Sequence, residues 1–193
     1  MSERLPGAAI VETVTTTINP DGTVNCAAMG VEWGDDVIVI KPFPSTRTLR
    51  NLHATGAAVV NLTDDILLFT QAALCDPHPP TRPTATIDGA VLSDACSWRE
   101  VTVEAIDESG PRARVTTRVV GRGVGREFLG FNRARHAVLE ASIVASRARM
   151  LPAAEIRAEL ARLQVLVDKT AGPREREAME LVRRHMRAAV GAE

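Results

Sequence analysis

Short apolar runs alternate with turn residues along the first two thirds of the chain. Residues 8–17 are dense in β-branched side chains, which suit the half-buried surface of a strand. Asn19-Pro20-Asp21-Gly22 follows, where proline presets φ and glycine accepts a positive φ, so TVNCAAMGVEW is predicted to return as the second strand of a hairpin. WREVTVEAIDE and RARVTTRVVG predict another hairpin around Ser109-Gly110-Pro111. Strands at intervals of about ten residues indicate an antiparallel barrel or sandwich.

The segments between these hairpins predict two more strands, one short helix and two connecting segments. VIVIK and AAVVNL are short, apolar strands. Ser45 can cap a short helix that Gly56 ends. The proline-rich CDPHPPTRPT cannot continue a central strand, so we expect an extended surface loop. Asp64-Asp65 is predicted to mark a turn.

After residue 131 the pattern changes from strands to helices. Asn132 can cap a helix over 133–149, Pro152 suits the start of a second helix, and a third follows Gly172. In the second helix an apolar stripe recurs at helical spacing, at Ile156, Leu160, Leu163 and Val167. The last third of the chain is therefore predicted to be helical.

Together these patterns predict a mainly β protein with α, formed by an antiparallel barrel in residues 1–131 and a helical annex in residues 132–193. A chain of 193 residues with 45% apolar residues can bury a core without a disulfide or a structural metal. The net charge is −1, but residues 1–132 hold 11 basic and 16 acidic groups, and residues 133–193 hold 12 and 8. Opposite charges and the lack of a polar-rich linker predict that the annex packs on the barrel.

Charge and apolar runs argue against two classes of partner. A net charge near zero is untypical of a nucleic-acid-binding protein, and acidic residues interleave with the arginines that could form a basic face, namely Arg147, Arg149, Arg157, Arg183, Arg184 and Arg187. No apolar run approaches the roughly 20 residues that span a membrane. MSERLPGAAI shows no secretory signal and the three separated cysteines suit a reducing compartment, so we expect a cytoplasmic protein.

Familiar catalytic motifs are missing from the sequence. We find no nucleophile elbow, zinc-protease motif or P-loop, and we predict no metal site. The glycine-rich run GRGVGR at 121–126 lacks the spacing of a dinucleotide-binding loop and follows a hairpin, so a flexible strand exit is the favoured interpretation.

Two segments have the composition of a ligand site. KPFPSTRTLRN at 41–51 combines hydroxyls, a guanidinium and a helix start, which are the groups that bind a phosphate; the alternative is a capped helix with a solvated face. The first hairpin places small and polar residues together, which lets a flat ring approach the backbone while asparagine and backbone amides contact its edge. The alternative there is a hairpin with a small-residue face.

These segments resemble, in the same order, the FMN-binding split-barrel proteins, the group that contains the flavin-reductase-like domains: VTTTINPDGTVNCAAMGV, KPFPSTRTLRNL and AAVVNL. More narrowly, FNRARHAVLEASIVASR and VDKTAGPREREAME resemble a poorly characterised flavoprotein family of methanogenic archaea and of bacteria with methanopterin-linked one-carbon metabolism. The resemblance implies a six-stranded Greek-key split barrel with added helices, FMN as cofactor, and a homodimer with flavin near the subunit interface.

The resemblance also implies which residues bind the cofactor. The loop and helix after the third strand would hold the FMN phosphate through Ser45, Thr46, Arg47 and Thr48, with Lys41 and Asn51 as neighbours. The ring edge would lie along the first hairpin, at Thr16, Thr17, Asn25, Ala27 and Met29, with Asn61 at the end of the next strand. Asn132 and Arg133 would close the site, from the same or the partner subunit. Cys26-Ala27-Ala28 stands where the family has an Ala-Pro step.

Two functions remain open from the sequence. One is an FMN-dependent oxidoreductase acting on a small molecule, for which the resemblance suggests a pterin or another one-carbon substrate. The other is a non-catalytic flavin-binding module, a sensor or carrier, with the same site residues. No catalytic residue is assigned, and Cys26 and His53 are the nearest candidates for a proton donor. Since only six residues are aromatic and none is tyrosine, flavin recognition is expected to rely on backbone, hydroxyl, arginine and aliphatic contacts.

Overall fold

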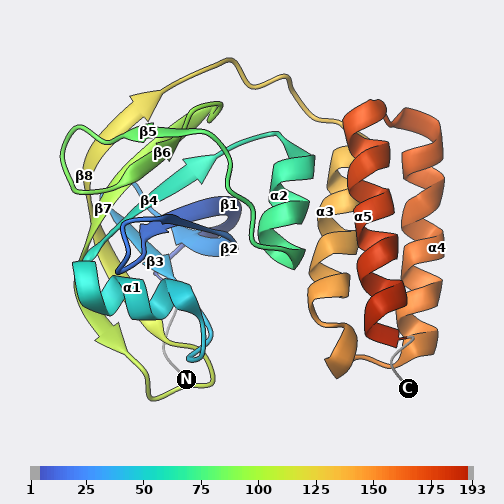
Figure 1. The fold of residues 1–193 in the computed structure, drawn as a ribbon, viewed down its shortest axis with the longest axis horizontal. Coiled ribbons are helices and arrows are strands. Elements are labelled where there is room, and N and C mark those ends of the chain that lie inside the picture. The colour runs from blue at the N-terminus through green and yellow to red at the C-terminus, as the bar shows by residue number, and fades with distance from the viewer. Residues whose placement is uncertain (1–4, 191–193) are drawn as a thin grey trace. The chain divides into compact units, whose positions relative to one another are not determined.

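Six antiparallel strands close into a barrel in the order β1-β2-β3-β8-β7-β4 (Figure 1). The computed structural model describes residues 5–190. The barrel strands are β1 (Ala9–Ile18), β2 (Val24–Trp33), β3 (Val37–Ile40), β4 (Ala57–Leu62), β7 (Ser97–Asp107) and β8 (Arg114–Val124). The hairpins β1–β2 and β7–β8 are the two that the turn signals predicted. The predicted antiparallel barrel with C-terminal helices is thereby confirmed.

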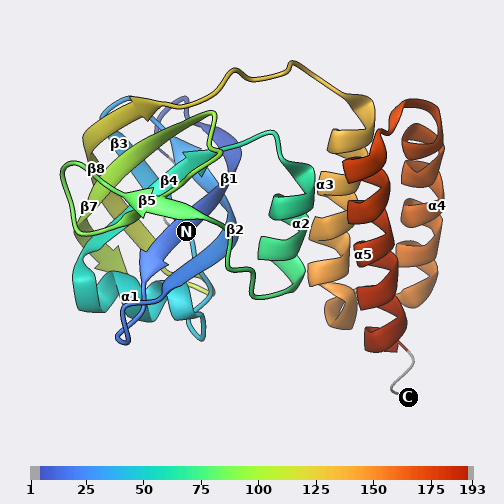
Figure 2. The same ribbon diagram turned by 45° about the horizontal axis from the view of Figure 1, so that its top comes forward.

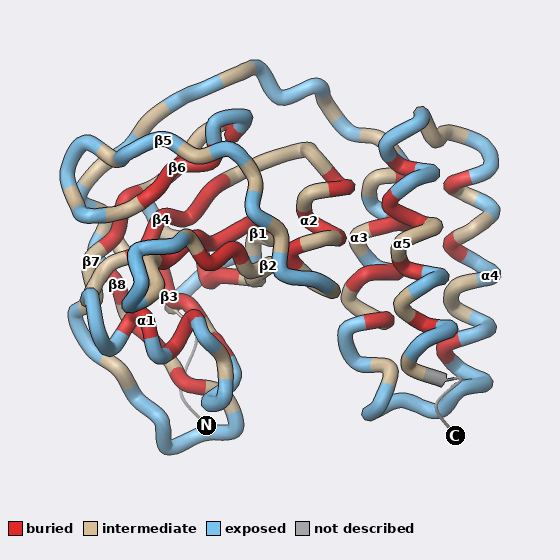
Figure 3. The backbone as a smooth tube through the Cα atoms, viewed as in Figure 1, coloured by how far each residue is buried: buried red, intermediate tan, exposed pale blue. Residues whose placement is uncertain are grey.

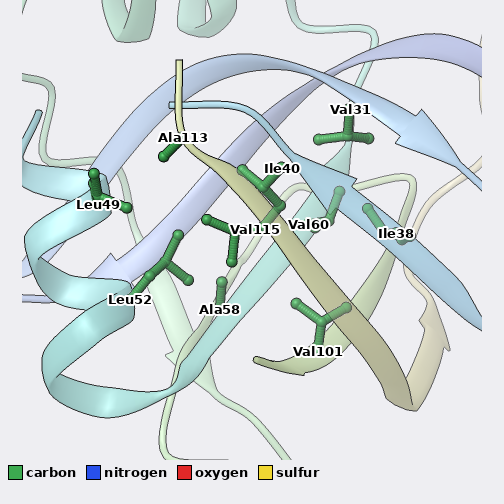
Figure 4. Close-up of a cluster of buried hydrophobic side chains, with 10 residues drawn as sticks. All are labelled: Val31, Ile38, Ile40, Leu49, Leu52, Ala58, Val60, Val101, Ala113 and Val115. Atoms are coloured by element: carbon green, nitrogen blue, oxygen red, sulfur yellow. The ribbon is translucent and has the colours of Figure 1, made fainter. Parts of the chain in front are cut away.

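Aliphatic side chains fill the barrel, and helix α1 (Arg47–Thr55) contributes to the same core (Figure 4). Leu49 and Leu52 lie three residues apart, on one face of α1, and neither is more than 2% exposed. The predicted helix end at Gly56 is confirmed: its φ is 64° and its N–H donates to the Leu52 carbonyl at 3.0 Å. The cluster that receives both leucines consists of Val31, Ile38, Ile40, Ala58, Val60, Val101, Ala113 and Val115.

A separate two-stranded sheet, β5 (Thr81–Pro83) and β6 (Ala90–Leu92), packs through β6 against β1 and β4 (β6 is labelled in Figure 1, and Figure 2 shows β5 from a second side). The expectation that CDPHPPTRPT is entirely a surface loop was wrong, because its last part is β5. Pro83 fits there because an edge strand tolerates proline. The loop between the two strands is held by the Glu100 carboxylate, which accepts the N–H groups of Ala85 at 3.2 Å and Thr86 at 2.7 Å.

The glycines of the run GRGVGR allow close approach of neighbouring segments. A Cβ added at Gly123 would lie 1.9 Å from the ring of Trp98, the residue paired with it in β7. A Cβ at Gly125 would lie 2.2 Å from the Ala95 carbonyl oxygen. Residues 121–124 belong to β8, so the run ends a strand as expected, while its flexibility stays a prediction.

Replacing Gly123 with alanine is expected to lower the free energy of unfolding by about 2 kcal/mol, because the new methyl group must displace the Trp98 ring. Gly110→Ala is a matched control: the nearest atom to its Cβ would be the Arg112 carbonyl oxygen at 3.5 Å. That variant should change stability by no more than about 0.5 kcal/mol. Urea unfolding measures both, and a Gly123→Ala midpoint equal to that of the wild type would contradict the packing described here.

Four helices form the second unit of the chain: α2 (Ile66–Leu74), α3 (Arg133–Ser146), α4 (Ala153–Thr170) and α5 (Pro173–Val190), with a 3-10 turn η1 (Ala148–Met150) after α3. Helix α2 follows β4 in the sequence but packs against α3 and α5. Helix α2 was not predicted, because ILLFTQAAL is an almost continuous apolar run without helical periodicity. Figure 3 shows buried positions recurring along all four helices.

Polar residues fix the starts of these helices. Asp65, expected to mark a turn, is the N-cap of α2 and accepts the N–H groups of Leu67 and Leu68. Asn132 caps α3 as predicted, through a bond from the Arg135 N–H at 3.0 Å, although α3 ends at Ser146 rather than 149. No helix among residues 5–190 is long and apolar enough to cross a bilayer.

The two units do not divide at a single point in the sequence. One contains the chain up to Thr63 together with His78–Glu127, and the other contains Asp64–Pro77 together with the chain from Phe128 onward. The boundary predicted after residue 131 lies near the last crossing but would assign α2 to the barrel. That the helices pack on the barrel stays a prediction.

Candidate functional site

The start of α1 presents several hydrogen-bond donors. Thr46, not Ser45, is the N-cap: its hydroxyl accepts the Leu49 N–H at 3.3 Å and donates to the Phe43 carbonyl at 2.8 Å. Ser45 and Arg47 are both exposed on either side of this cap. Since the first N–H groups of a helix have no intrahelical acceptor, this end combines backbone donors, a hydroxyl and a guanidinium.

Two arginines outside the predicted site residues contact this loop from neighbouring segments. Arg50 donates from Nη1 to the Ser45 carbonyl at 2.9 Å. The Arg112 guanidinium, from the β7–β8 turn, lies 4.1 Å over the ring of Phe43. Arg50 was within the segment already chosen, but nothing near Arg112 in the sequence indicates this contact, because it depends on where the distant hairpin turn lies.

A buried polar cluster joins β1, β2 and α1. The Thr17 hydroxyl accepts one bond from Asn25 Nδ2 at 3.1 Å and another from Asn51 Nδ2 at 2.9 Å. Asn25 Nδ2 also donates to Thr48 Oγ1 at 3.2 Å, and Asn51 Nδ2 donates to Asn19 Oδ1 at 2.9 Å. All members except Asn19 are at most 5% exposed. Four of the predicted site residues are therefore brought together, but in the interior.

Thr16 and Asn61 are brought together on the opposite face of the barrel wall, beneath β6. Asn61 Nδ2 donates to Thr16 Oγ1 at 3.2 Å and to the Val14 carbonyl at 3.0 Å. Asn61 Oδ1 accepts the Leu92 N–H at 3.0 Å, and Thr16 Oγ1 donates to the Ala90 carbonyl at 2.5 Å. With exposures of 1% and 0%, these side chains attach β6 to the barrel.

Lys41, expected as a neighbour of the phosphate-binding residues, is partly buried and belongs to an ion cluster around the buried Glu32. Its Nζ is 3.0 Å from Glu32 Oε1, and Arg114 Nη1 is 2.8 Å from the same oxygen. Glu32 is fully buried, and its Oε2 accepts the Leu5 N–H at 3.0 Å. Burial raises the pKa of Glu32, but the bonds from its three donors outweigh it and lower the pKa from 4.5 to about 2.

The remaining predicted residues are distributed over both units. Ala27 and Met29 are half-buried in β2, where Met29 packs against the barrel core. Asn132 and Arg133 belong to the helical unit, in which Asn132 Nδ2 donates to the Thr170 carbonyl at 3.2 Å and Arg133 is exposed.

The two candidate proton donors occupy different environments. Cys26 is 4% exposed within β2. His53, near the end of α1, places Nε2 at 2.9 Å from Glu108 Oε1, and both side chains are about half exposed. Among residues 5–190, no three His, Cys, Asp or Glu side chains lie close enough together to hold a metal ion.

The exposed donors at the start of α1 fit a phosphate group. Ser45 and Arg47 offer a hydroxyl and a charged planar donor next to a helix N-terminus, and Arg50 and Arg112 add positive charge to the same loop. This set of donors suits the phosphate of FMN, whereas the polar groups of the buried clusters already bind one another.

Two family models match the chain. The N-terminal domain of a protein family of unknown function, DUF447, matches residues 11–126, and the remaining DUF447 model matches residues 132–184. Together they span the barrel strands and most of the C-terminal helices.

Solved structures share this fold. An FMN-bound protein of Methanosarcina mazei, assigned to the same DUF447 model, is 20% identical, with a TM-score of 0.81 over 92% of this chain and 95% of its own. A flavoredoxin of Methanosarcina acetivorans, 12% identical, has a TM-score of 0.55 over 67% and 78%. Component B of a nitrilotriacetate monooxygenase from Mycobacterium thermoresistibile, 17% identical, has a TM-score of 0.53 over 62% and 71%.

Proposed function

The chain belongs to the DUF447 family, and we propose that it binds FMN and acts as a flavin-dependent oxidoreductase. The observation that carries the proposal is that an FMN-bound protein of the same family has the same fold over 92% of this chain. The donors at the start of α1 support it independently, because their chemistry is that of a phosphate site.

The residues of this chain that would hold the cofactor are those exposed at that helix start. The Ser45 hydroxyl, the Arg47 guanidinium and the backbone N–H groups of the first turn of α1 would bind the phosphate. Bound FMN supplies hydride and single-electron transfer. The protein's own contribution is to bind the cofactor and to orient it, and the positive charge of Arg50 and Arg112 increases the attraction of this loop for a dianion.

The visible absorption spectrum of the purified protein tests FMN binding. We expect a flavin spectrum, and the mass of the ligand released by denaturation should be that of FMN. A colourless protein that takes up no added FMN would contradict the proposal. Riboflavin serves as the control ligand, because it has the same ring system without the phosphate.

Turnover tests the oxidoreductase activity. Under anaerobic conditions we expect the bound flavin to be bleached by NADH, NADPH, a reduced electron carrier or a reduced pterin, the last being the substrate class that the sequence resemblance suggests. If FMN stays bound but none of these donors reduces it, the protein is a flavin-binding module, as in the alternative function.

A homodimer remains part of the proposal, as the sequence resemblance implies. Exposed aromatic side chains of the helical unit support it: Phe128 and Phe131 are 50% and 90% exposed, their ring centroids lie 5.9 Å apart, and exposed apolar groups that gather in this way are typical of association surfaces. Light scattering of the FMN-loaded protein measures its molar mass in solution, which should be that of two chains. The cytoplasmic location and the lack of a nucleic-acid partner stay predictions from the sequence.

A further inference from the structure

We propose that Thr17, Asn25, Thr48 and Asn51 are positioning residues for the FMN phosphate. They fix the start of α1 against the β1–β2 hairpin and do not contact the cofactor themselves. The inference rests on the proposed function, and it gives these four residues a different role from the direct contacts that the sequence resemblance implies.

Burial separates these residues from the donors that a ligand can reach. Thr17, Asn25, Thr48 and Asn51 are 2%, 5%, 2% and 1% exposed in the protein alone. A bound cofactor or a second subunit can only reduce exposure further, so these side chains offer no surface for a ligand. Among residues 5–190, no buried side-chain nitrogen or oxygen lacks a hydrogen-bond partner, so the cluster is also complete without one.

The cluster constrains α1 in a way that the apolar contacts do not. Leu49 and Leu52 attach the helix to the core, but apolar contacts are non-directional and permit small shifts along a surface. Hydrogen bonds, by contrast, depend on distance and angle. Thr48, one residue after Arg47, accepts such a bond, and Asn51, four residues after Arg47, donates one. A displacement of α1 would therefore break these bonds before it disturbed the leucines.

The same bonds connect α1 to the turn of the first hairpin. Asn51 donates to Asn19, whose own Nδ2 donates to Thr23 Oγ1 at 2.9 Å. The Thr23 hydroxyl donates in turn to Asp21 Oδ1 at 2.6 Å. The turn and the helix start are thus held in one continuous hydrogen-bonded arrangement, so the position of Arg47 and its neighbours depends on the hairpin.

The test removes one hydroxyl from the cluster without changing its shape. Thr48→Val deletes one of the two acceptors of the Asn25 amide, the one that lies on α1, and we expect FMN to bind about tenfold more weakly because the phosphate donors shift. Riboflavin should bind as to the wild type. At saturating FMN, the ³¹P resonance of the bound phosphate should move toward that of free FMN, while the visible band stays unchanged.

Two further variants show whether the effect belongs to this cluster. Thr48→Ser restores the hydroxyl and should restore FMN affinity and the ³¹P resonance. Thr117→Val is the matched control, since its hydroxyl is also fully buried in the barrel, where it donates to the Ile38 carbonyl at 2.8 Å, and it should leave both readouts unchanged. Thr48→Ala repeats the test should Thr48→Val fail to fold.

The possible results are distinct. A ³¹P resonance and an FMN affinity that do not change in Thr48→Val overturn the positioning role. A changed visible band, or an equal loss of FMN and riboflavin, also overturns it, because the cluster would then act on the ring. A wild-type protein that binds no FMN refutes the proposed function, a result that is recognised before any variant is measured.

Discussion

Replacing Arg47 with alanine is expected to weaken FMN binding by about 30-fold while leaving the stability of the barrel nearly unchanged. Arg47 is the first residue of α1 and is exposed, so its loss removes a charge-assisted bond to the phosphate without opening a cavity. A hydrogen bond to a charged group contributes about 1.5–3 kcal/mol, and a 30-fold loss of affinity lies within that range. Titration of apoprotein with FMN, followed by flavin fluorescence, gives the dissociation constant.

The control for Arg47→Ala is another exposed arginine far from α1 in the sequence. Arg162→Ala in α4 removes another exposed side chain, which pairs with Glu159, and should leave FMN affinity unchanged. Added salt should weaken FMN binding in the wild type more than in Arg47→Ala, because salt screens the attraction between Arg47 and the phosphate, which the variant lacks. An unchanged dissociation constant in Arg47→Ala would remove this residue from the phosphate site.

Replacing Glu32 with alanine is expected to lower the free energy of unfolding by about 3–5 kcal/mol, the largest loss among the variants considered. Glu32 is fully buried and pairs with both Lys41 and Arg114, so its removal leaves two partly buried cations without this shared partner. Glu104→Ala is the matched control, because Glu104 and Arg118 form an exposed pair on the same barrel and should contribute less than about 1 kcal/mol. Urea denaturation at pH 7 compares both with the wild type.

The pH dependence of stability gives a second measurement of the same carboxylate. The pKa of Glu32 is about 2 in the folded protein and 4.5 in the unfolded reference, so the folded state favours the ionised form. The resulting stabilisation, about 3 kcal/mol, is present above pH 4.5 and is lost as the pH falls toward 2. As the pH falls from 4.5 to 2, the free energy of unfolding should therefore decrease less in Glu32→Gln than in the wild type. Parallel curves for the two proteins would contradict the shifted pKa.

Much of the barrel could be predicted from the sequence because its signals are local. Turn residues fix the β1–β2 and β7–β8 hairpins, and β-branched runs of suitable length define the strands. Helix α2 could not be predicted in the same way. A nine-residue segment in which only Thr70 and Gln71 are polar fits a buried strand as well as a buried helix. Asp65 can be recognised as an N-cap only once the segment is known to be a helix.

The candidate site could be predicted in composition but not in orientation. The hydroxyls and arginine of residues 45–47 suit a phosphate or a capped helix by their types, and the family resemblance implied the phosphate; Ser45 and Arg47 lie exposed on either side of the Thr46 cap. Whether Thr17 or Asn61 is accessible depends on strand register, on the cover provided by β6, and on α1. Register and packing are set by the tertiary structure. The sequence therefore indicated polar residues near the site but could not show which of them form hydrogen bonds with one another.

The path of the chain has a consequence for how this protein could arise or be divided. The chain leaves the barrel unit at Thr63, returns at His78 and leaves again at Glu127, so helix α2 is inserted into the barrel sequence but packs with α3 and α5. A gene cut between the two matched family segments would produce a barrel fragment with the apolar side chains of α2 uncovered, namely Ile66, Leu67, Phe69 and Ala72. Recombination at that point would yield an aggregation-prone product, and the two halves are therefore expected to be inherited together rather than exchanged as independent modules.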